Sequence, residues 1–254
     1  MSFKDIFNID AEVKESAHAR VNLIGEHTDY TGGYVMPTLL SFKNTIEISQ
    51  NNSNEFTVYS QHFKEKTTFN DFKKSTNNEW VDYIKGCLHI FFDENKISSR
   101  FLSIFISSDI PLERGISSSS ALCVATLKAL NTFFETKIKD PEIAKLAKKV
   151  EFNYIGVSGG IMDQMVSSIG IHGKAFFMNC KNLEYELINF PENWKFCLID
   201  SEVQRNLRDS SYNERFAELQ EAEKKLGVEY LGEVKKENFQ KDKFENNTIA
   251  KRAK

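Results

Sequence analysis

Hydrophobic residues follow two spacings along the chain, and these predict different elements. Short, nearly continuous apolar runs occupy 21–24, 34–40 and 101–106, and runs of this length typically form strands. In 79–92, apolar residues recur every three or four positions, which predicts a helix. Further helices are expected at about 118–135 and 141–155. The second would have Asp140 as its N-cap and Pro141 at its first helical position.

The pattern changes after residue 173. Three segments, KAFFMN, LEYELINF and WKFCLID, predict strands. From Asp209 onward charged residues predominate, while Phe216, Leu219 and Leu226 line one face of a predicted helix. A domain boundary is therefore expected near residue 190. Residues 1–190 would form an N-terminal domain, and residues 191–254 would begin a C-terminal one.

Composition narrows the class of protein. The 254 residues are 41% hydrophobic and 27% charged, as in an ordinary globular protein, and the net charge of -3 argues against a nucleic-acid partner. No apolar segment approaches the length of a membrane helix, and no signal peptide is evident. The cysteines, at positions 87, 123, 180 and 197, lack CxxC spacing. They predict free core thiols in a reducing cytoplasm rather than a zinc site.

The segment RVNLIGEHTDYTGGYV, residues 20–35, carries the strongest chemical signal. Glu26, His27, Thr28 and Asp29 stand between two apolar runs. The Gly-Gly pair that follows is typical of a hairpin turn, so turn chemistry alone could explain the loop. A plain turn, however, does not need three ionisable residues within four positions. Closely spaced donors and acceptors suit a small, hydroxyl-rich ligand.

A run of four serines, Ser117–Ser120, follows Gly115 and opens a predicted helix. The first turn of a helix has free N–H groups and a positive dipole end, so such a loop can bind phosphate. A serine hydroxyl can also coordinate Mg²⁺. Simple capping of the helix is the alternative, although four serines exceed what capping requires. The loop has neither Walker A nor GxGxxG spacing.

A third candidate site is GVSGGIMDQ, residues 156–164. Asp163 lies between apolar neighbours just after Gly159 and Gly160, which allow close backbone approach to a ligand. This carboxylate could act as a base or anchor, or could merely cap a helix. Glu151 by its own pattern is a surface helix residue. Together the three segments suit phosphoryl transfer from ATP to a sugar alcohol.

These segments resemble the galactokinases of the GHMP kinase superfamily. NLIGEHTDYTGGYV is similar to the family's sugar-recognition signature, GISSSSAL to its phosphate loop, and GGIMDQ to the segment carrying its active-site aspartate. WVDYIKG and RDSSYNER agree as well. The resemblance implies an α+β fold of two domains, with a complete N-terminal α/β domain and an incomplete ferredoxin-like C-terminal domain. It implies a cytoplasmic monomer that uses ATP and Mg²⁺ to convert D-galactose to galactose 1-phosphate in the Leloir pathway.

The resemblance also implies residue roles. Arg20 and Asp163 would form the catalytic pair. The sugar contacts would be Glu26, His27, Asp29, Gly160 and Tyr212. The nucleotide phosphates would contact Gly115, Ser117, Ser118 and Ser119, and Mg²⁺ would be held by Ser119 and Glu151.

The sequence departs from the family pattern at three places. Glu113 and Arg114 replace small residues of the phosphate loop, and His18-Ala19 replaces Pro-Gly; His18 alone suggests a surface or strand residue. The family's C-terminal glycine-rich motif is missing, which suggests an N-terminal portion that is weakly stable or inactive alone. Two alternatives stay open: a catalytically impaired sugar and nucleotide sensor, and a kinase for N-acetylgalactosamine or arabinose.

Overall fold

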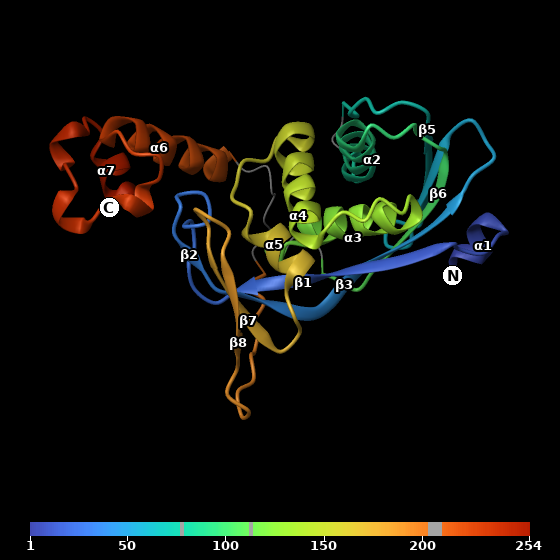
Figure 1. The fold of residues 1–254 in the computed structure, drawn as a ribbon, viewed down its shortest axis with the longest axis horizontal. Coiled ribbons are helices and arrows are strands. Elements are labelled where there is room, and N and C mark those ends of the chain that lie inside the picture. Colours follow the sequence, from blue (N-terminus) through green and yellow to red (C-terminus); the bar gives the residue numbers. More distant parts are fainter. Residues whose placement is uncertain (77–78, 112–113, 203–209) are drawn as a thin grey trace.

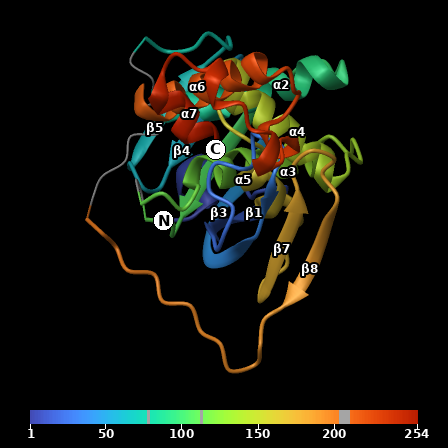
Figure 2. The ribbon, with the colours of Figure 1, turned by 90° about the vertical axis from the view of Figure 1, so that its left-hand side faces the viewer.

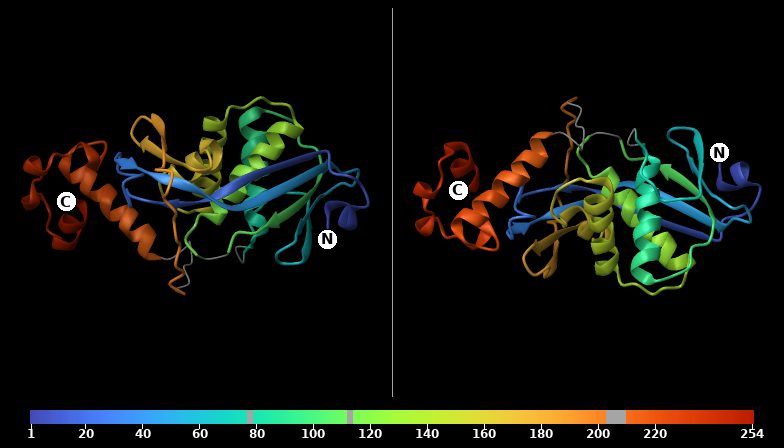
Figure 3. Two further views of the ribbon diagram at one scale, coloured as in Figure 1. Left: turned by 90° about the horizontal axis from the view of Figure 1, so that it is seen from below. Right: turned by 90° about the horizontal axis from the view of Figure 1, so that it is seen from above.

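The computed structural model describes residues 1–76, 79–111, 114–202 and 210–254, with side chains of the last stretch described from Asn213 onward. It is a mixed α+β structure in which helices pack on one face of a twisted sheet (Figure 1). Seen from opposite sides, the strands are in front in one view and the helices in the other (Figure 3).

The strands of the described residues form one eight-stranded sheet. They are β1 Val13–Asn22, β2 Tyr34–Val35, β3 Pro37–Gln50, β4 Phe56–Ser60, β5 Glu65–Phe69, β6 Leu102–Ser108, β7 Lys174–Asn179 and β8 Tyr185–Asn189. The order is β2-β7-β3-β6-β4-β5, with β1 also paired to β3 and β8 to β7. Only β4 and β6 run parallel among these pairs. The long strand β3 is thus central to the sheet.

The helices are α1 Phe3–Phe7, α2 Val81–Asn95, α3 Ser118–Phe133, α4 Asp140–Lys149, α5 Met162–Ile169, α6 Ser210–Leu226 and α7 Asn247–Ala253. A π-helix, η1 Val150–Ile155, continues α4, and the 3-10 turns η2 Leu231–Glu233, η3 Lys236–Asn238 and η4 Lys241–Lys243 lie between α6 and α7. The main core lies between the sheet and α2, α3 and α4. Ile46, Ile104, Leu88 and Leu127 are fully buried there, and such burial is the main force that holds the layers together.

Most predicted spans agree with the structure. The apolar run 101–106 forms β6, KAFFMN is β7, and LEYELINF contains β8. The helices expected at 79–92 and 118–135 are α2 and α3. His18 is a strand residue of β1, as expected, and its Nδ1 lies 2.9 Å from the Leu40 carbonyl oxygen.

The start and end of the predicted 141–155 helix need correction. Asp140 is the first helical residue and not the N-cap. The carbonyl of Lys139 accepts from Glu142 N at 2.9 Å and Ile143 N at 3.0 Å, so Lys139 is the N-cap. The last part, from Val150, is π-helical, a conformation that occurs mainly as single turns within α-helices and often at functional sites.

The prediction of a strand at WKFCLID was wrong. Residues 194–200 have no regular secondary structure, and Trp194 and Ile199 are 65% and 88% exposed. Cys197 is likewise exposed rather than a core thiol, whereas the other three cysteines are free and buried as expected. A strand needs backbone partners, and none of the described strands pairs with this segment. It runs well outside the body of the molecule (Figure 2).

The C-terminal helices form a small unit beyond the β2 end of the sheet (Figures 1 and 2). Its own apolar cluster is Ala222, Phe244, Ile249 and Ala250. The backbone N–H of Gly232 donates to the Thr31 carbonyl at 2.8 Å, and the Phe216 and Tyr30 rings lie 5.1 Å apart. The C-terminal unit therefore contacts the loop between β1 and β2. The domain boundary near residue 190 stays a prediction.

Candidate functional site

Arg20 joins three elements at the centre of the site. The β1–β3 register shifts between His18 and Arg20, and such irregularities re-aim side chains and are common beside active sites. Arg20 Nε and Nη2 donate to the two carboxylate oxygens of Asp163 at 2.6 and 2.7 Å, and Nη1 donates to the Gly115 carbonyl at 3.0 Å. Its backbone N–H also donates to the Ile116 carbonyl at 3.2 Å. One strand residue thus fixes both the serine loop and Asp163.

Electrostatics reinforce this bidentate pair. Burial opposes the charge on Arg20, but the carboxylate of Asp163 raises the pKa of the guanidinium above its ordinary value. A planar guanidinium matches both oxygens of a carboxylate, which a lysine could not do. Arg20 therefore stays charged and holds the Asp163 carboxylate in one orientation.

Ser117 connects the serine loop to the same carboxylate. Its backbone is left-handed, with φ 61°, and its hydroxyl donates to Asp163 Oδ2 at 2.5 Å. Ser117 is the N-cap residue of α3, yet its side chain makes no capping hydrogen bond. The alternative interpretation of the serine run, simple capping of the helix, does not hold at Ser117, because its hydroxyl bonds Asp163 instead. The Ser118 carbonyl accepts from Asn44 Nδ2 at 2.9 Å.

Glu151, expected on the surface by its own pattern, is buried. It is the second residue of the π-helix, and only 7% of it is exposed. Ser119 Oγ donates to its Oε1 at 2.7 Å, Ser120 Oγ to its Oε2 at 2.8 Å, and Gln164 Nε2 to the same Oε2 at 2.5 Å. Burial raises the pKa of Glu151, while these three hydrogen bonds act in the opposite direction.

The residues around Glu151 fit a magnesium ion. Mg²⁺ prefers oxygen ligands and is usually held by one or two carboxylates, with substrate phosphates and water completing the shell. Ser119 Oγ and Glu151 Oε1 lie 2.7 Å apart, which suits neighbouring positions in one shell. Gln164 Oε1 is buried beside them without a hydrogen-bond partner among the described residues, an acceptor that a hydrated ion could satisfy. In the described part of the chain, no group of three or more His, Cys, Asp or Glu residues is placed so that it could hold a metal ion by itself.

The glutamate-histidine loop, residues 23–33, lies beside this centre and brings Asp29 against Gly160. A Cβ atom at position 160 would lie only 2.6 Å from Asp29 Cβ, so only glycine fits there. Burial, followed by the charge of Asp163, raises the pKa of Asp29 to about 7. The structure therefore unites Asp29, Gly160 and Asp163, which the sequence predicted as parts of one site.

The other predicted sugar contacts are Glu26, His27 and Tyr212. Glu26 accepts from Asn22 Nδ2 at 3.0 Å, and His27 Nδ1 lies 2.6 Å from the Tyr30 hydroxyl. His27 has a left-handed backbone, with φ 63°. Tyr212 falls in the first turn of α6, and its side chain lies outside the described part of the structure.

Of the two departures in the serine loop, Glu113 lies outside the described residues. Arg114 forms an ion pair with Asp200, with Nε 2.9 Å from Oδ2. Two residues of this site, Ser120 and Gln164, were not predicted from the sequence. The signal that could have found Gln164 is its place directly after Asp163, as a polar residue within an otherwise apolar first turn.

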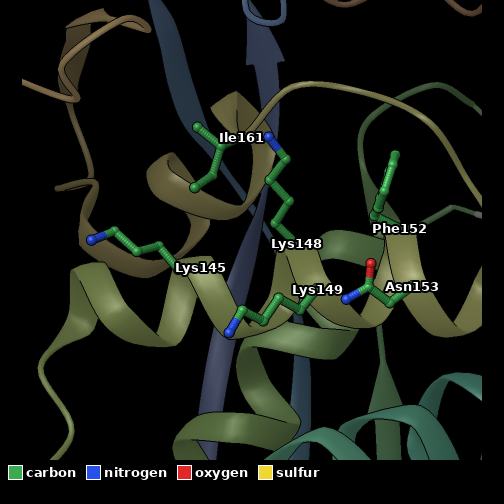
Figure 4. Close-up of a pocket in the computed structure, with 6 residues that line it drawn as sticks. All are labelled: Lys145, Lys148, Lys149, Phe152, Asn153 and Ile161. Carbon is green, nitrogen blue, oxygen red and sulfur yellow. The ribbon is translucent and has the colours of Figure 1, made fainter. Parts of the chain in front are cut away.

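A separate pocket of about 290 Å³, named the basic pocket for its three lysines, lies along α4 and η1 (Figure 4). It is lined by Lys145, Lys148, Lys149, Phe152, Asn153 and Ile161, none of which was predicted as a site residue. Burial lowers the pKa of Lys148, and the charge of Asp29 acts against that shift. The pocket adjoins the site through Ile161, the neighbour of Gly160.

Two family models match different parts of this chain. Residues 1–50 match the model of the galactokinase galactose-binding signature, and residues 82–170 match that of the GHMP kinase N-terminal domain. A galactokinase of Thermotoga petrophila is 35% identical over 242 residues, which are 95% of this chain and 67% of that protein. A galactokinase of Thermococcus kodakarensis is also 35% identical, over 87% of this chain and 63% of its own length.

The chain belongs to the galactokinase family. The crystal structure of Lactococcus lactis galactokinase complexed with galactose superposes with a TM-score of 0.87 at 31% identity, over 99% of this chain and 68% of that one. Methanococcus jannaschii mevalonate kinase shares the fold, with a TM-score of 0.60 at 21% identity. The mixed α+β, GHMP kinase-like fold inferred from the motifs is thereby confirmed.

The two family-model matches cover different parts of the site. The signature match contains Arg20, Glu26, His27 and Asp29, and the kinase-domain match contains the serine loop, Glu151 and Asp163. The chain spans about two thirds of the length of these galactokinase relatives. Among the described residues, no helix is long and apolar enough to cross a membrane.

Proposed function

We propose that this member of the galactokinase family transfers the terminal phosphoryl group of ATP to the anomeric hydroxyl of D-galactose. The product would be galactose 1-phosphate, which enters galactose catabolism through the Leloir pathway. The observation that carries the proposal is the junction at Arg20. That residue bonds both Asp163 and the carbonyl of Gly115, so a carboxylate and a phosphate-binding loop meet at one point.

In this proposal the sugar lies between the loop 23–33 and Asp163. Asp29, Glu26 and His27 supply acceptors and donors for its hydroxyls, and Tyr212 is assigned to it by resemblance alone. A site that pairs individual hydroxyls discriminates strongly against sugars that leave its buried polar groups unpaired. Gly160 allows Asp29 to approach the site, because a larger residue would displace its side chain.

Asp163 would orient the anomeric hydroxyl and take its proton as the phosphoryl group moves. Three donors, two from Arg20 and one from Ser117, fix the position of its carboxylate. Such positioning supplies a large part of the rate enhancement in phosphoryl transfer. The N–H groups of the first turn of α3, with Ser117, Ser118 and Ser119, would bind the phosphates of ATP.

Ser119 and Glu151 would hold Mg²⁺, which when bound neutralises the charge of the phosphates. Glu151 supplies the charged ligand and Ser119 a neutral one. The guanidinium of Arg20 adds positive charge beside the reacting hydroxyl.

A coupled ADP-release assay with a panel of sugars, made on the full-length protein, tests the proposal. We expect release with galactose, and its loss in Asp163→Asn. A matched control is Asp140→Asn, because Asp140 also stands in the first turn of a helix but lies outside the site. Galactose binding without ADP release would favour the sensor alternative, and release only with N-acetylgalactosamine or arabinose would change the assigned sugar.

A further inference from the structure

Two helix N-termini meet around Glu151 and hold its two oxygens differently. Among the described residues, Oε1 accepts a hydrogen bond only from the Ser119 hydroxyl, at 2.7 Å. Oε2 accepts both Ser120 Oγ, at 2.8 Å, and Gln164 Nε2, at 2.5 Å. Oε2 is therefore occupied by two donors from α3 and α5, while Oε1 shares its surroundings with a single hydroxyl.

All members of this cluster are buried. Ser120 is 3% exposed and Gln164 is 6% exposed. In such surroundings a carboxylate keeps one orientation, because turning it would break hydrogen bonds between buried groups. The asymmetry between the two oxygens is thus a fixed property of the fold.

The second atom of the Gln164 amide adds an independent observation. Its Oε1 is buried and lacks a hydrogen-bond partner among the described residues. Buried polar atoms are nearly always paired, so an exception needs an explanation. A carbonyl oxygen beside a carboxylate is a natural acceptor for water molecules that a magnesium ion retains.

We propose that Gln164 and Ser120 are positioning residues for the metal ligand Glu151. They hold Oε2, so that Oε1, next to the Ser119 hydroxyl, is the oxygen presented to Mg²⁺. The amide oxygen of Gln164 is available to the hydration shell of the ion. The inference rests on the proposed function, since it assumes that a magnesium nucleotide is bound here.

The position of Gln164 links this arrangement to the reacting end of the site. It directly follows Asp163 in the first turn of α5. The serine loop makes the corresponding pair of contacts: Ser117 donates to Asp163 and Ser119 to Glu151. The start of α3 therefore contacts both carboxylates, through its N-cap Ser117 and through its first turn, whereas α5 carries Asp163 and contacts Glu151 through Gln164.

The test is a titration with Mn²⁺ in the presence of ADP, followed by electron paramagnetic resonance on the full chain. Mn²⁺ takes similar oxygen ligands and its bound signal reports the ligand shell. Gln164→Met keeps the length of the side chain and removes both polar atoms. We expect it to weaken Mn²⁺ binding by about 10- to 100-fold, as is typical when a residue that orients a metal ligand is lost.

Ser120→Ala and Ser168→Ala form a matched pair. Both serines are buried, and each donates one hydrogen bond of 2.8 Å, but Ser168 donates to the Asp140 carbonyl and not to Glu151. We expect weaker Mn²⁺ binding in Ser120→Ala only, even if both variants lose similar thermal stability. If Gln164→Met fails to fold, this pair decides the question.

The outcomes separate this inference from the proposed function. If the wild-type chain binds no Mn²⁺ with ADP, the proposed function fails and the inference fails with it. If Glu151→Gln weakens binding but Gln164→Met and Ser120→Ala bind as tightly as wild type, the metal site stands and the positioning role is wrong. Weaker Mn²⁺ binding in both Gln164→Met and Ser120→Ala, with an altered spectrum, supports the inference.

Discussion

The two ends of the proposed site hold their carboxylates by different means. The phosphate end consists of the serine loop, Asp163 and Glu151. Each of these two carboxylates accepts three hydrogen bonds. The sugar end consists of the loop 23–33 and Gly160. There Asp29 packs closely on the glycine, and burial raises the pKa of Asp29 to about 7. Carboxylates fixed by donors suit constant charge and position. A carboxylate that packs on glycine and has a pKa of about 7 can change its charge near neutral pH.

The largest expected effect is at the phosphate end. Arg20→Met removes both bonds to Asp163 and the bond to Gly115, so the loop and the carboxylate lose their common anchor. We expect kcat to fall by about 10²- to 10³-fold. Arg20→Lys should recover little, because an ammonium group cannot bond both carboxylate oxygens in a plane. Steady-state kinetics with galactose and ATP measure this, and near-wild-type turnover in Arg20→Met would contradict the role of the junction.

The next effect is at the sugar end. In Gly160→Ala the new methyl group would overlap the Asp29 side chain and displace it. We expect the KM for galactose to rise by about 10²-fold, as misplacement by about an ångström can cause, with little change in the KM for ATP. Gly173→Ala is the control, since a Cβ there meets open space and only its φ of 78° is unfavourable. Equal rises in both KM values would show that the two ends are not separable.

The raised pKa of Asp29 predicts a dependence of stability on pH. Because its pKa in the folded state, about 7, lies above the unfolded value, Asp29 disfavours folding once it ionises. This destabilising effect of Asp29 is absent below about pH 4 and grows as the pH rises toward 7. Asp29→Asn should therefore unfold at the same temperature as wild type at low pH. At pH 8 the variant should unfold at a temperature about 3 °C or more above that of wild type. Calorimetry at several pH values measures this difference, and equal unfolding temperatures at pH 8 would contradict the prediction.

The smallest effect concerns the basic pocket beside the sugar end. Lys148 stabilises the ionised form of Asp29, so Lys148→Met should raise the pKa of Asp29 further. We expect an upward shift of less than about one unit in the pH at which Asp29 titrates. Carbon-13 NMR of labelled aspartate measures it. Lys145→Met is the matched control from the same pocket, because Lys145 pairs with Glu142 at 2.7 Å; an equal shift in both would refute a specific role of Lys148.

Local pattern predicted much of this fold and part of its site. The apolar run at 101–106 and the spacing in 79–92 required no tertiary information, because each element buries the face that its own sequence marks. The same reasoning failed at WKFCLID, where seven residues typical of a strand remain exposed and unpaired with the described sheet. A strand needs a neighbouring strand to pair its backbone groups, and the hydrophobicity of a segment does not provide that neighbour.

The sequence by itself determined the kinds of groups available: an acidic and histidine-bearing loop, a serine run at a helix start, and an aspartate after two glycines. Those motifs were enough to indicate the family. Only the tertiary structure decided which groups meet. Arg20 and Asp163 are 143 positions apart and Ser119 and Glu151 are 32 apart, and no local spacing encodes such contacts. Burial of Glu151 and the partnership with Gln164 follow from two helix ends packing together, so they became visible only in three dimensions.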